Sequence, residues 1–214
     1  MGEINRSRLA WALAIIGVIF FLDQLTKHLV LQTDVFNALG CLDLSERCGK
    51  IELSSVMDLS MVWNRGFSFG VAQSEGLWRW VLVFVQFAVS IIFMGWLLKA
   101  KHRTTVLALA MVIGGALGNV VDRIRFGAVV DFFDFSGPWF GIEFPLPGPL
   151  AMIEGIFTPP GLQDGLLGLG FPYVFNIADA GITIGAILLL VDQFLLKRHG
   201  DDAGSSGKTT LNNA

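Results

Sequence analysis

The stretch Trp80–Leu98, WVLVFVQFAVSIIFMGWLL, contains 19 consecutive residues without a charged side chain. A helix rises about 1.5 Å per residue and needs about 20 apolar residues to cross the hydrocarbon core of a bilayer. The stretch therefore predicts a helix that spans a membrane. Residues 104–121 are also free of charge and predict a second spanning helix close behind the first.

The composition of the whole chain agrees with a membrane protein. Of the 214 residues, 15% are charged and 53% are hydrophobic, and the mean hydropathy is +0.63. An ordinary soluble domain carries about 25% charged residues, so this chain has too few charges to cover its apolar surface in water. The same figures exclude a disordered chain, a nucleic-acid-binding protein with a basic stripe and a disulfide-dense secreted domain.

The first apolar stretch is shorter than the others. Residues 9–22 are uncharged, but they reach the length of a span only if the helix continues to Leu31 and takes Asp23 and Lys27 into the membrane. A cleaved signal peptide is the alternative, but no cleavage site with small residues follows the stretch. We therefore expect the stretch to remain in the protein as a membrane span. We expect an all-α membrane protein, with four transmembrane helices over about 9–31, 80–98, 104–123 and 175–196.

Basic residues predict the orientation of these helices. Eight of the 15 Lys and Arg residues precede the first span, link the second to the third, or follow the last. Because basic residues concentrate on the cytoplasmic side, we expect both termini there. Residues 1–199 would form one integral membrane domain with long outer loops over 32–79 and 126–174, and a disordered cytoplasmic tail would cover 200–214.

The two outer loops differ in character. Residues 51–70 partly alternate between apolar and polar side chains, which predicts a small extracytoplasmic β-sheet. Cys41 and Cys48 lie in the same loop, where we expect a disulfide, with two free thiols as the alternative. All seven prolines lie within 138–172 among apolar side chains, which predicts an irregular loop against the membrane or another surface.

Polar side chains of three expected helices fall at one depth. Asp23, Asn119 and Asp179 lie roughly 21, 23 and 26 Å above the cytoplasmic ends of their helices. Asn176 shares a helix face with Asp179, and Asp131 follows the third span closely enough to return to this layer. Since charged residues within spans are costly and mark function by default, we expect a functional polar site near the outer leaflet.

Few kinds of chemistry fit this site. The sequence has no His/Cys cluster with metal-ligand spacing, no glycine-rich phosphate loop after a strand, and no histidine placed to activate Ser68. A pair of aspartates remains, in which one carboxyl holds a proton while the other activates water, without a cofactor or metal. Asp131 and Asp179 are the pair nearest the outer water and are the predicted catalytic residues.

Two other classes of membrane protein compete with a protease. Intramembrane Asp and Lys residues also form proton relays, so a small proton-coupled transporter or relay protein is the alternative. A conduction path needs polar residues through the whole membrane, whereas here they gather in its outer third. A structural or assembly protein would tolerate Asp131→Asn and Asp179→Asn, and a protease would not.

Five short motifs carry a family resemblance. They are DQLTK at 23–27, NRGFSFG at 64–70, GGALGNVVDR at 114–123, GAVVDF at 127–132 and FNIAD at 175–179. In this order and at these places in the topology, they resemble bacterial lipoprotein signal peptidase (signal peptidase II), a family of four-span aspartyl proteases of the inner membrane. The resemblance covers about 9–31, 56–135 and 173–196.

The resemblance implies a role for each motif residue. Asp131 and Asp179 would be the catalytic dyad, whose water attacks the peptide bond before the lipid-modified cysteine of a diacylglyceryl prolipoprotein. Asp23, Lys27 and Asp122 would hold the polar core together. The residues that would contact the substrate or support the dyad are Asn64, Gly115, Asn119, Arg123 and Asn176.

The resemblance also implies the setting of the reaction. The enzyme would need no cofactor and would meet its substrate and membrane phospholipid as a monomer in the bacterial inner membrane, with its active site near the outer leaflet. The chain between Asp131 and Asp179 is far longer than is usual in the family. From its apolar, Pro/Gly-rich composition we expect a flap over the substrate groove.

Overall fold

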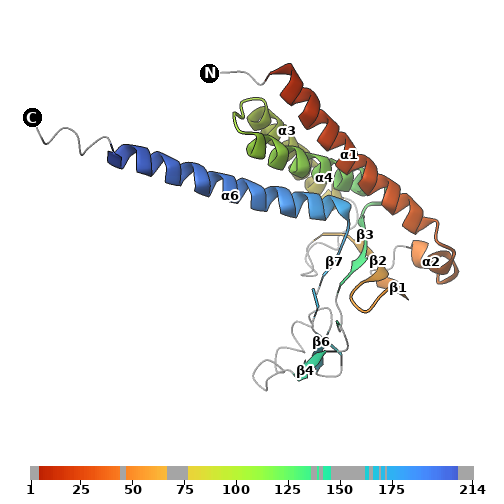
Figure 1. Cartoon of the computed structure of the whole chain (residues 1–214). Coiled ribbons are helices and arrows are strands. Elements are labelled where there is room, and N and C mark those ends of the chain that lie inside the picture. The colour runs from red at the N-terminus through yellow and green to blue at the C-terminus, as the bar shows by residue number, and fades with distance from the viewer. Residues whose placement is uncertain are drawn as a thin grey trace, which may run out of the picture. The chain divides into compact units, whose positions relative to one another are not determined.

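The computed structural model describes residues 5–43, 47–66, 77–135, 139, 142–145, 162–163, 166–168, 170–171 and 173–206. Within this part of the chain, four helices are long and apolar enough to cross a membrane (Figure 1). They are α1 (Arg6–Leu31), α3 (Leu77–Leu97), α4 (Arg103–Phe126) and the first part, Ile177–Phe194, of α6 (Ile177–Ser206). The expected four-helix membrane architecture is confirmed.

Two short helical segments, α2 (Asp34–Ala38) and η1 (Cys41–Asp43), follow α1. At the other end of the chain, α6 continues to Ser206 and so includes 200–206, which the polar composition assigned to a disordered tail. No proline occurs between 195 and 206, so nothing removes a backbone donor from the helical hydrogen-bond ladder. Residues 207–214 lie outside the described part of the chain.

A four-stranded antiparallel sheet accompanies the helices, with the strand order β1-β2-β3-β7. Its strands are β1 (Arg47–Glu52), β2 (Asp58–Asn64), β3 (Val129–Asp134) and β7 (Val174–Phe175). The small sheet expected in the first long loop is confirmed, but half of its strands come from the second loop. In the register, Asn64 lies opposite Val129 and Phe133 lies opposite Phe175, so the sheet gathers three distant parts of the sequence.

The Pro/Gly-rich segment is not wholly irregular, and the expectation of an irregular loop is wrong for part of it. A second, three-stranded antiparallel sheet has the order β4-β6-β5, formed by β4 (Glu143–Pro145), β5 (Leu162–Gln163) and β6 (Leu166–Gly168). Prolines and glycines break the segment into short apolar runs, and such runs can pair as strands between turns. The rest of the expected flap lies mostly outside the described residues.

The chain forms two compact units. The first unit comprises residues 1–22, 84–120 and 178–214, and the second comprises 23–83 and 121–177. Small residues let the helices of the first unit approach closely. A Cβ atom at Gly114 would lie 2.9 Å from the Ile16 carbonyl oxygen, and one at Gly185 would lie 2.7 Å from that of Ala108.

The second unit has its own apolar core on the sheet, which includes Phe36, Met61 and Trp63. A disulfide joins Cys41 to Cys48, with an S–S distance of 2.11 Å. The Trp63 indole N–H donates to the Cys41 carbonyl oxygen at 2.7 Å, so the disulfide loop is attached to β2.

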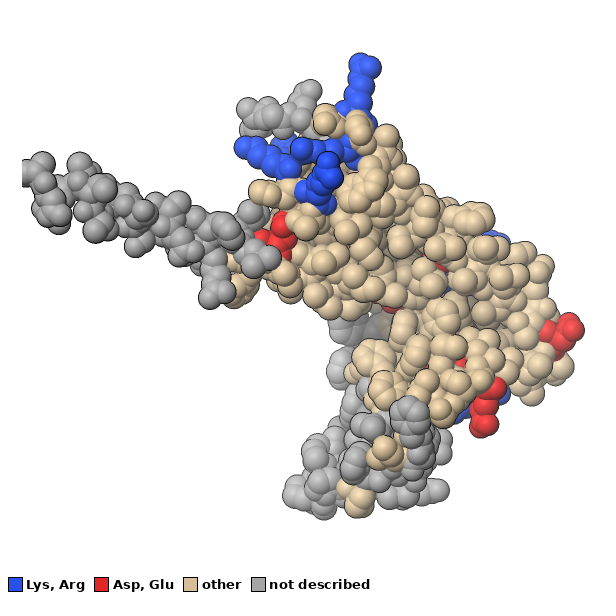
Figure 2. All heavy atoms as spheres, viewed as in Figure 1, with Lys and Arg blue, Asp and Glu red and all other residues tan. Residues whose placement is uncertain are grey.

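Basic side chains gather in the first unit where α1 begins and where α3 is linked to α4 (Figure 2). This cluster, called the basic end below, consists of Arg6, Arg8, Lys99, Lys101 and Arg103.

Candidate active site

A buried ion-pair cluster lies in the second unit between α1 and α4. The Lys27 ammonium nitrogen is 2.9 Å from an Asp23 carboxylate oxygen and 2.7 Å from an Asp122 oxygen. None of these three side chains is more than 3% exposed. The Gln24 amide donates to both carboxylates, at 3.2 Å to Asp23 and 3.0 Å to Asp122. One lysine and one amide thus satisfy two buried carboxylates, which is the condition for keeping such charges away from water.

The cluster also connects α4 to the sheet. The Val130 backbone N–H donates to the Asp122 carboxylate at 3.2 Å, and Val130 immediately precedes Asp131 on β3. Between the helix and the strand, Gly127 has a φ of +81°, and its N–H donates to the Arg123 carbonyl oxygen at 3.1 Å. A glycine in this left-handed conformation is a common way to end a helix, and here it turns the chain directly into the strand that carries Asp131.

Asp131 is held by two asparagine side chains of the second unit. The Asn176 amide donates to one carboxylate oxygen at 2.6 Å, and the Asn64 amide donates to the other at 3.0 Å. The Asn64 side-chain oxygen accepts the Gly66 N–H at 3.0 Å, which fixes the direction of its amide. Asp131 is only 2% exposed. Each of its two carboxylate oxygens is therefore oriented by an asparagine donor and not by bulk water.

Asp179 lies in the first unit, in the first turn of α6, where a carboxylate interacts favourably with the helix dipole. The Asn119 amide of α4 donates to an Asp179 oxygen at 2.8 Å. One turn earlier on α4, Gly115 lies so close to α6 that a Cβ atom would collide with the Ala178 carbonyl oxygen. The glycine therefore allows the helix contact that brings Asn119 to Asp179.

The structure groups the predicted site residues into three sets. Asp131 is bound by Asn64 and Asn176, Asp179 is bound by Asn119, and Asp23, Lys27 and Asp122 form the ion-pair cluster. Arg123 is 8% exposed in the last turn of α4. Residues 67–70 of the second motif lie outside the described part of the chain.

Sequence reasoning missed several polar residues. Gln24 lies inside the first motif, between two predicted core residues, and its position alone could have marked it. Ser60 donates to Asp134 at 2.6 Å between neighbouring strands, a contact that only the sheet register reveals. Asp192 of α6 accepts hydrogen bonds from the hydroxyls of Thr104 and Thr105 at the start of α4. In the described residues, no group of three or more His, Cys, Asp or Glu side chains could hold a metal ion.

Comparisons with known proteins point to one family. A family model described as signal peptidase (SPase) II matches residues 15–195. The lipoprotein signal peptidase of Caulobacter vibrioides is 33% identical over 201 residues, which cover 93% of this chain and 96% of the relative. That of Sphingopyxis alaskensis is 35% identical over 208 residues, which cover 96% of each chain.

Two solved structures share the fold. Both are described as bacterial membrane enzymes determined by the in meso method, at 2.3 and 1.9 Å resolution. They match with a TM-score of 0.60 at 22% and 21% sequence identity. The first comparison covers 94% of this chain and 95% of the other, and the second covers 90% and 97%.

Proposed function

The chain belongs to the signal peptidase II family of aspartic peptidases, and on this basis we propose that Asp131 and Asp179 are its two catalytic aspartates. Its activity is that of a lipoprotein signal peptidase, which removes signal peptides from prolipoproteins. Membership of this family decides against the proton-coupled transporter. The remaining question is which residues perform the hydrolysis.

The assignment rests on the hydrogen bonds that two asparagines make to the two aspartates. Asn176 donates to Asp131 and precedes Asp179 by three residues. Asn119 donates to Asp179 and precedes Asp122 by three residues, and Asp122 in turn accepts the N–H of the residue before Asp131. Each predicted catalytic aspartate is therefore bound by an asparagine side chain of its own unit, which holds the carboxyl group in a defined orientation.

The proposed chemistry uses the two carboxyl groups as base and acid. One aspartate takes a proton from water as the water oxygen attacks the carbonyl carbon of the scissile peptide bond. The other, protonated, donates to the leaving amide nitrogen when the bond breaks. Asn64, Asn119 and Asn176 keep the carboxyl groups in position, and an amide N–H of this kind can also stabilise the oxyanion of the tetrahedral intermediate.

The proposal extends to the substrate and the membrane. The substrate is a diacylglyceryl prolipoprotein, cleaved before its lipid-modified cysteine by a monomeric enzyme of the bacterial inner membrane. The basic end supports an orientation with both termini in the cytoplasm (Figure 2). Asp131 and Asp179 would then work near the outer leaflet, where the lipid anchor of the substrate remains in the bilayer.

The test is cleavage of a diacylated prolipoprotein by the purified full chain in detergent. Asp131→Asn and Asp179→Asn should each lower kcat by about 10⁴-fold or more, because residues that act as a unit cannot substitute for one another. Asp192→Asn is the matched control, since it changes the same residue type in the same helix as Asp179. The assignment fails if either dyad variant, folded as judged by circular dichroism, cleaves at the wild-type rate.

A further inference from the structure

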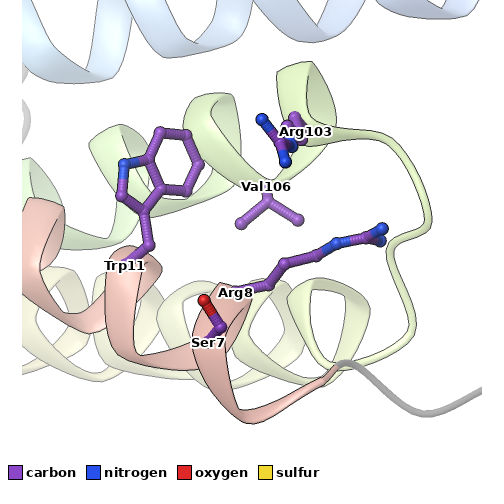
Figure 3. A pocket seen from close by; sticks show the side chains of 5 residues that line it. All are labelled: Ser7, Arg8, Trp11, Arg103 and Val106. Atoms are coloured by element: carbon purple, nitrogen blue, oxygen red, sulfur yellow. The ribbon is translucent and has the colours of Figure 1, made fainter.

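A separate pocket opens at the basic end of the first unit, between the start of α1 and the start of α4. Its volume is about 260 Å³. Figure 3 shows Trp11 and Arg103 on two sides of Val106, with Arg8 extending from α1 toward the loop before α4. The remaining lining residues are Ser7 and the fully buried Val106.

The sequence spacing on both helices aligns these side chains. Ser7 and Trp11 are four residues apart on α1, and Arg103 and Val106 are three apart on α4, so each pair lies on one helix face. The Arg8 guanidinium donates to the Lys101 carbonyl oxygen at 2.8 Å. Since a guanidinium has five N–H donors, this bond fixes the group while leaving donors for a ligand.

The pocket contains two arginines, and the Asp192 carboxylate near the start of α4 is bound by the hydroxyls of Thr104 and Thr105. Among the described residues, no carboxylate lies within ion-pair distance of Arg8 or Arg103. The nearby charged side chains of the basic end, Arg6, Lys99 and Lys101, are also cationic and exposed. Arg103 stands in the first turn of α4, where the helix dipole adds partial positive charge. Such a pocket favours an anion.

We propose that this pocket binds the headgroup phosphate of an anionic glycerophospholipid. Guanidinium groups match phosphate oxygens in a two-point geometry. Trp11 is 43% exposed, as expected for a tryptophan at the level of the lipid headgroups. About two turns further along the same face of the helix, Val18 is 55% exposed and offers apolar contact to an acyl chain. Basic pockets between membrane helices attract anionic headgroups on the cytoplasmic side.

The test is lipid binding to the purified full chain in a neutral detergent, followed by native mass spectrometry. Phosphatidylglycerol should bind with 1:1 stoichiometry. Its Kd should be about tenfold lower than that of phosphatidylcholine, which equals about 1.4 kcal/mol. The double variant Arg8→Gln with Arg103→Gln should lose this preference. Arg6→Gln with Lys99→Gln is the matched control, because it removes the same charge from the same end outside the pocket.

A single Arg103→Gln variant guards against misfolding. The Arg103 side chain is exposed and makes no hydrogen bond or ion pair with the described residues, so its replacement should leave the fold intact. The preference for phosphatidylglycerol should still be reduced. Prolipoprotein cleavage in lipid-free detergent should be unchanged in all these variants. The readout is therefore independent of the catalytic assignment.

Three results would overturn the proposal. Equal binding of the two lipids would remove the anion preference. Equal losses in the pocket and control variants would mean diffuse surface charge in place of a site. Binding of inorganic phosphate or glycerol 3-phosphate as tight as that of phosphatidylglycerol would assign the pocket to a soluble phosphate compound.

Discussion

The helices α3 and α4 look alike in the sequence and differ in the structure. Their most apolar 18-residue windows have mean hydropathies of 2.2 and 1.9, yet 17% of the α3 window and 72% of the α4 window are buried. Ile92 of α3 is 66% exposed, whereas Ile113 of α4 is 1% exposed. Hydropathy therefore tells which segments cross the membrane and says little about which of them face protein.

The reason for the difference lies in the residues between the large apolar ones. α4 carries glycines where neighbouring backbones come close, and its last turns carry Asn119, Asp122 and Arg123. α3 has no Asp, Glu or Asn along its length, and most of its bulky side chains are exposed, although Leu97 at its end is buried. In lipid, where apolar surface is not driven inward, small and polar residues mark the interior.

The largest stability effect should come from the ion pair anchored on α4. Lys27→Met leaves the buried Asp23 and Asp122 carboxylates without their ammonium partner, and we expect a loss of about 3–5 kcal/mol in the free energy of unfolding. Lys50→Met is the control, because Lys50 is 2.8 Å from Asp58 but 41% exposed, and we expect a loss of about 0–1 kcal/mol. Unfolding in mixed detergent micelles measures both, and equal losses would contradict a buried charge cluster.

Truncation of a matched pair of isoleucines should come next. Ile113→Ala leaves a cavity inside the first unit, and we expect the free energy of unfolding to fall by about 2–3 kcal/mol. This is the low end of the usual range, because an isoleucine of a helix separated from its neighbours still contacts apolar lipid. Ile92→Ala in α3 should change the stability by less than about 0.5 kcal/mol, since lipid fills the space. If both variants unfold alike, the buried position of α4 is wrong.

The smallest stability effect should come from a matched pair of glycines. A methyl group at Gly115 would meet the Ala178 carbonyl oxygen, so Gly115→Ala should cost about 1–3 kcal/mol. It should also lower the cleavage rate, because it moves α6 away from the α4 residue Asn119 that holds Asp179. Gly95→Ala in α3 meets nothing within 4 Å, so its rate and stability should not fall. A Gly115→Ala enzyme with wild-type kcat would exclude this positioning role.

Sequence reasoning found the helices and the small sheet, and it failed where structure depends on pairing. The strands β4, β5 and β6 are two or three residues long, too short for a periodic signal. The same limit applies to Asp192, whose threonine partners lie 87 and 88 residues away in the sequence. The aspartates could be predicted from the sequence, because each lies in a short motif and because a charged residue is energetically costly near a membrane.

The sequence by itself determined that the chain crosses a membrane, and it predicted which carboxylates lie at one depth. Both are local properties, since a span depends on about 20 consecutive residues and depth follows from the helical rise. Only the tertiary structure decided that Asn64 and Asn176 hold the two oxygens of Asp131, and that Lys27 lies between Asp23 and Asp122. These contacts join distant segments through strand register and close helix packing, and a buried polar group is stable only where such partners meet it.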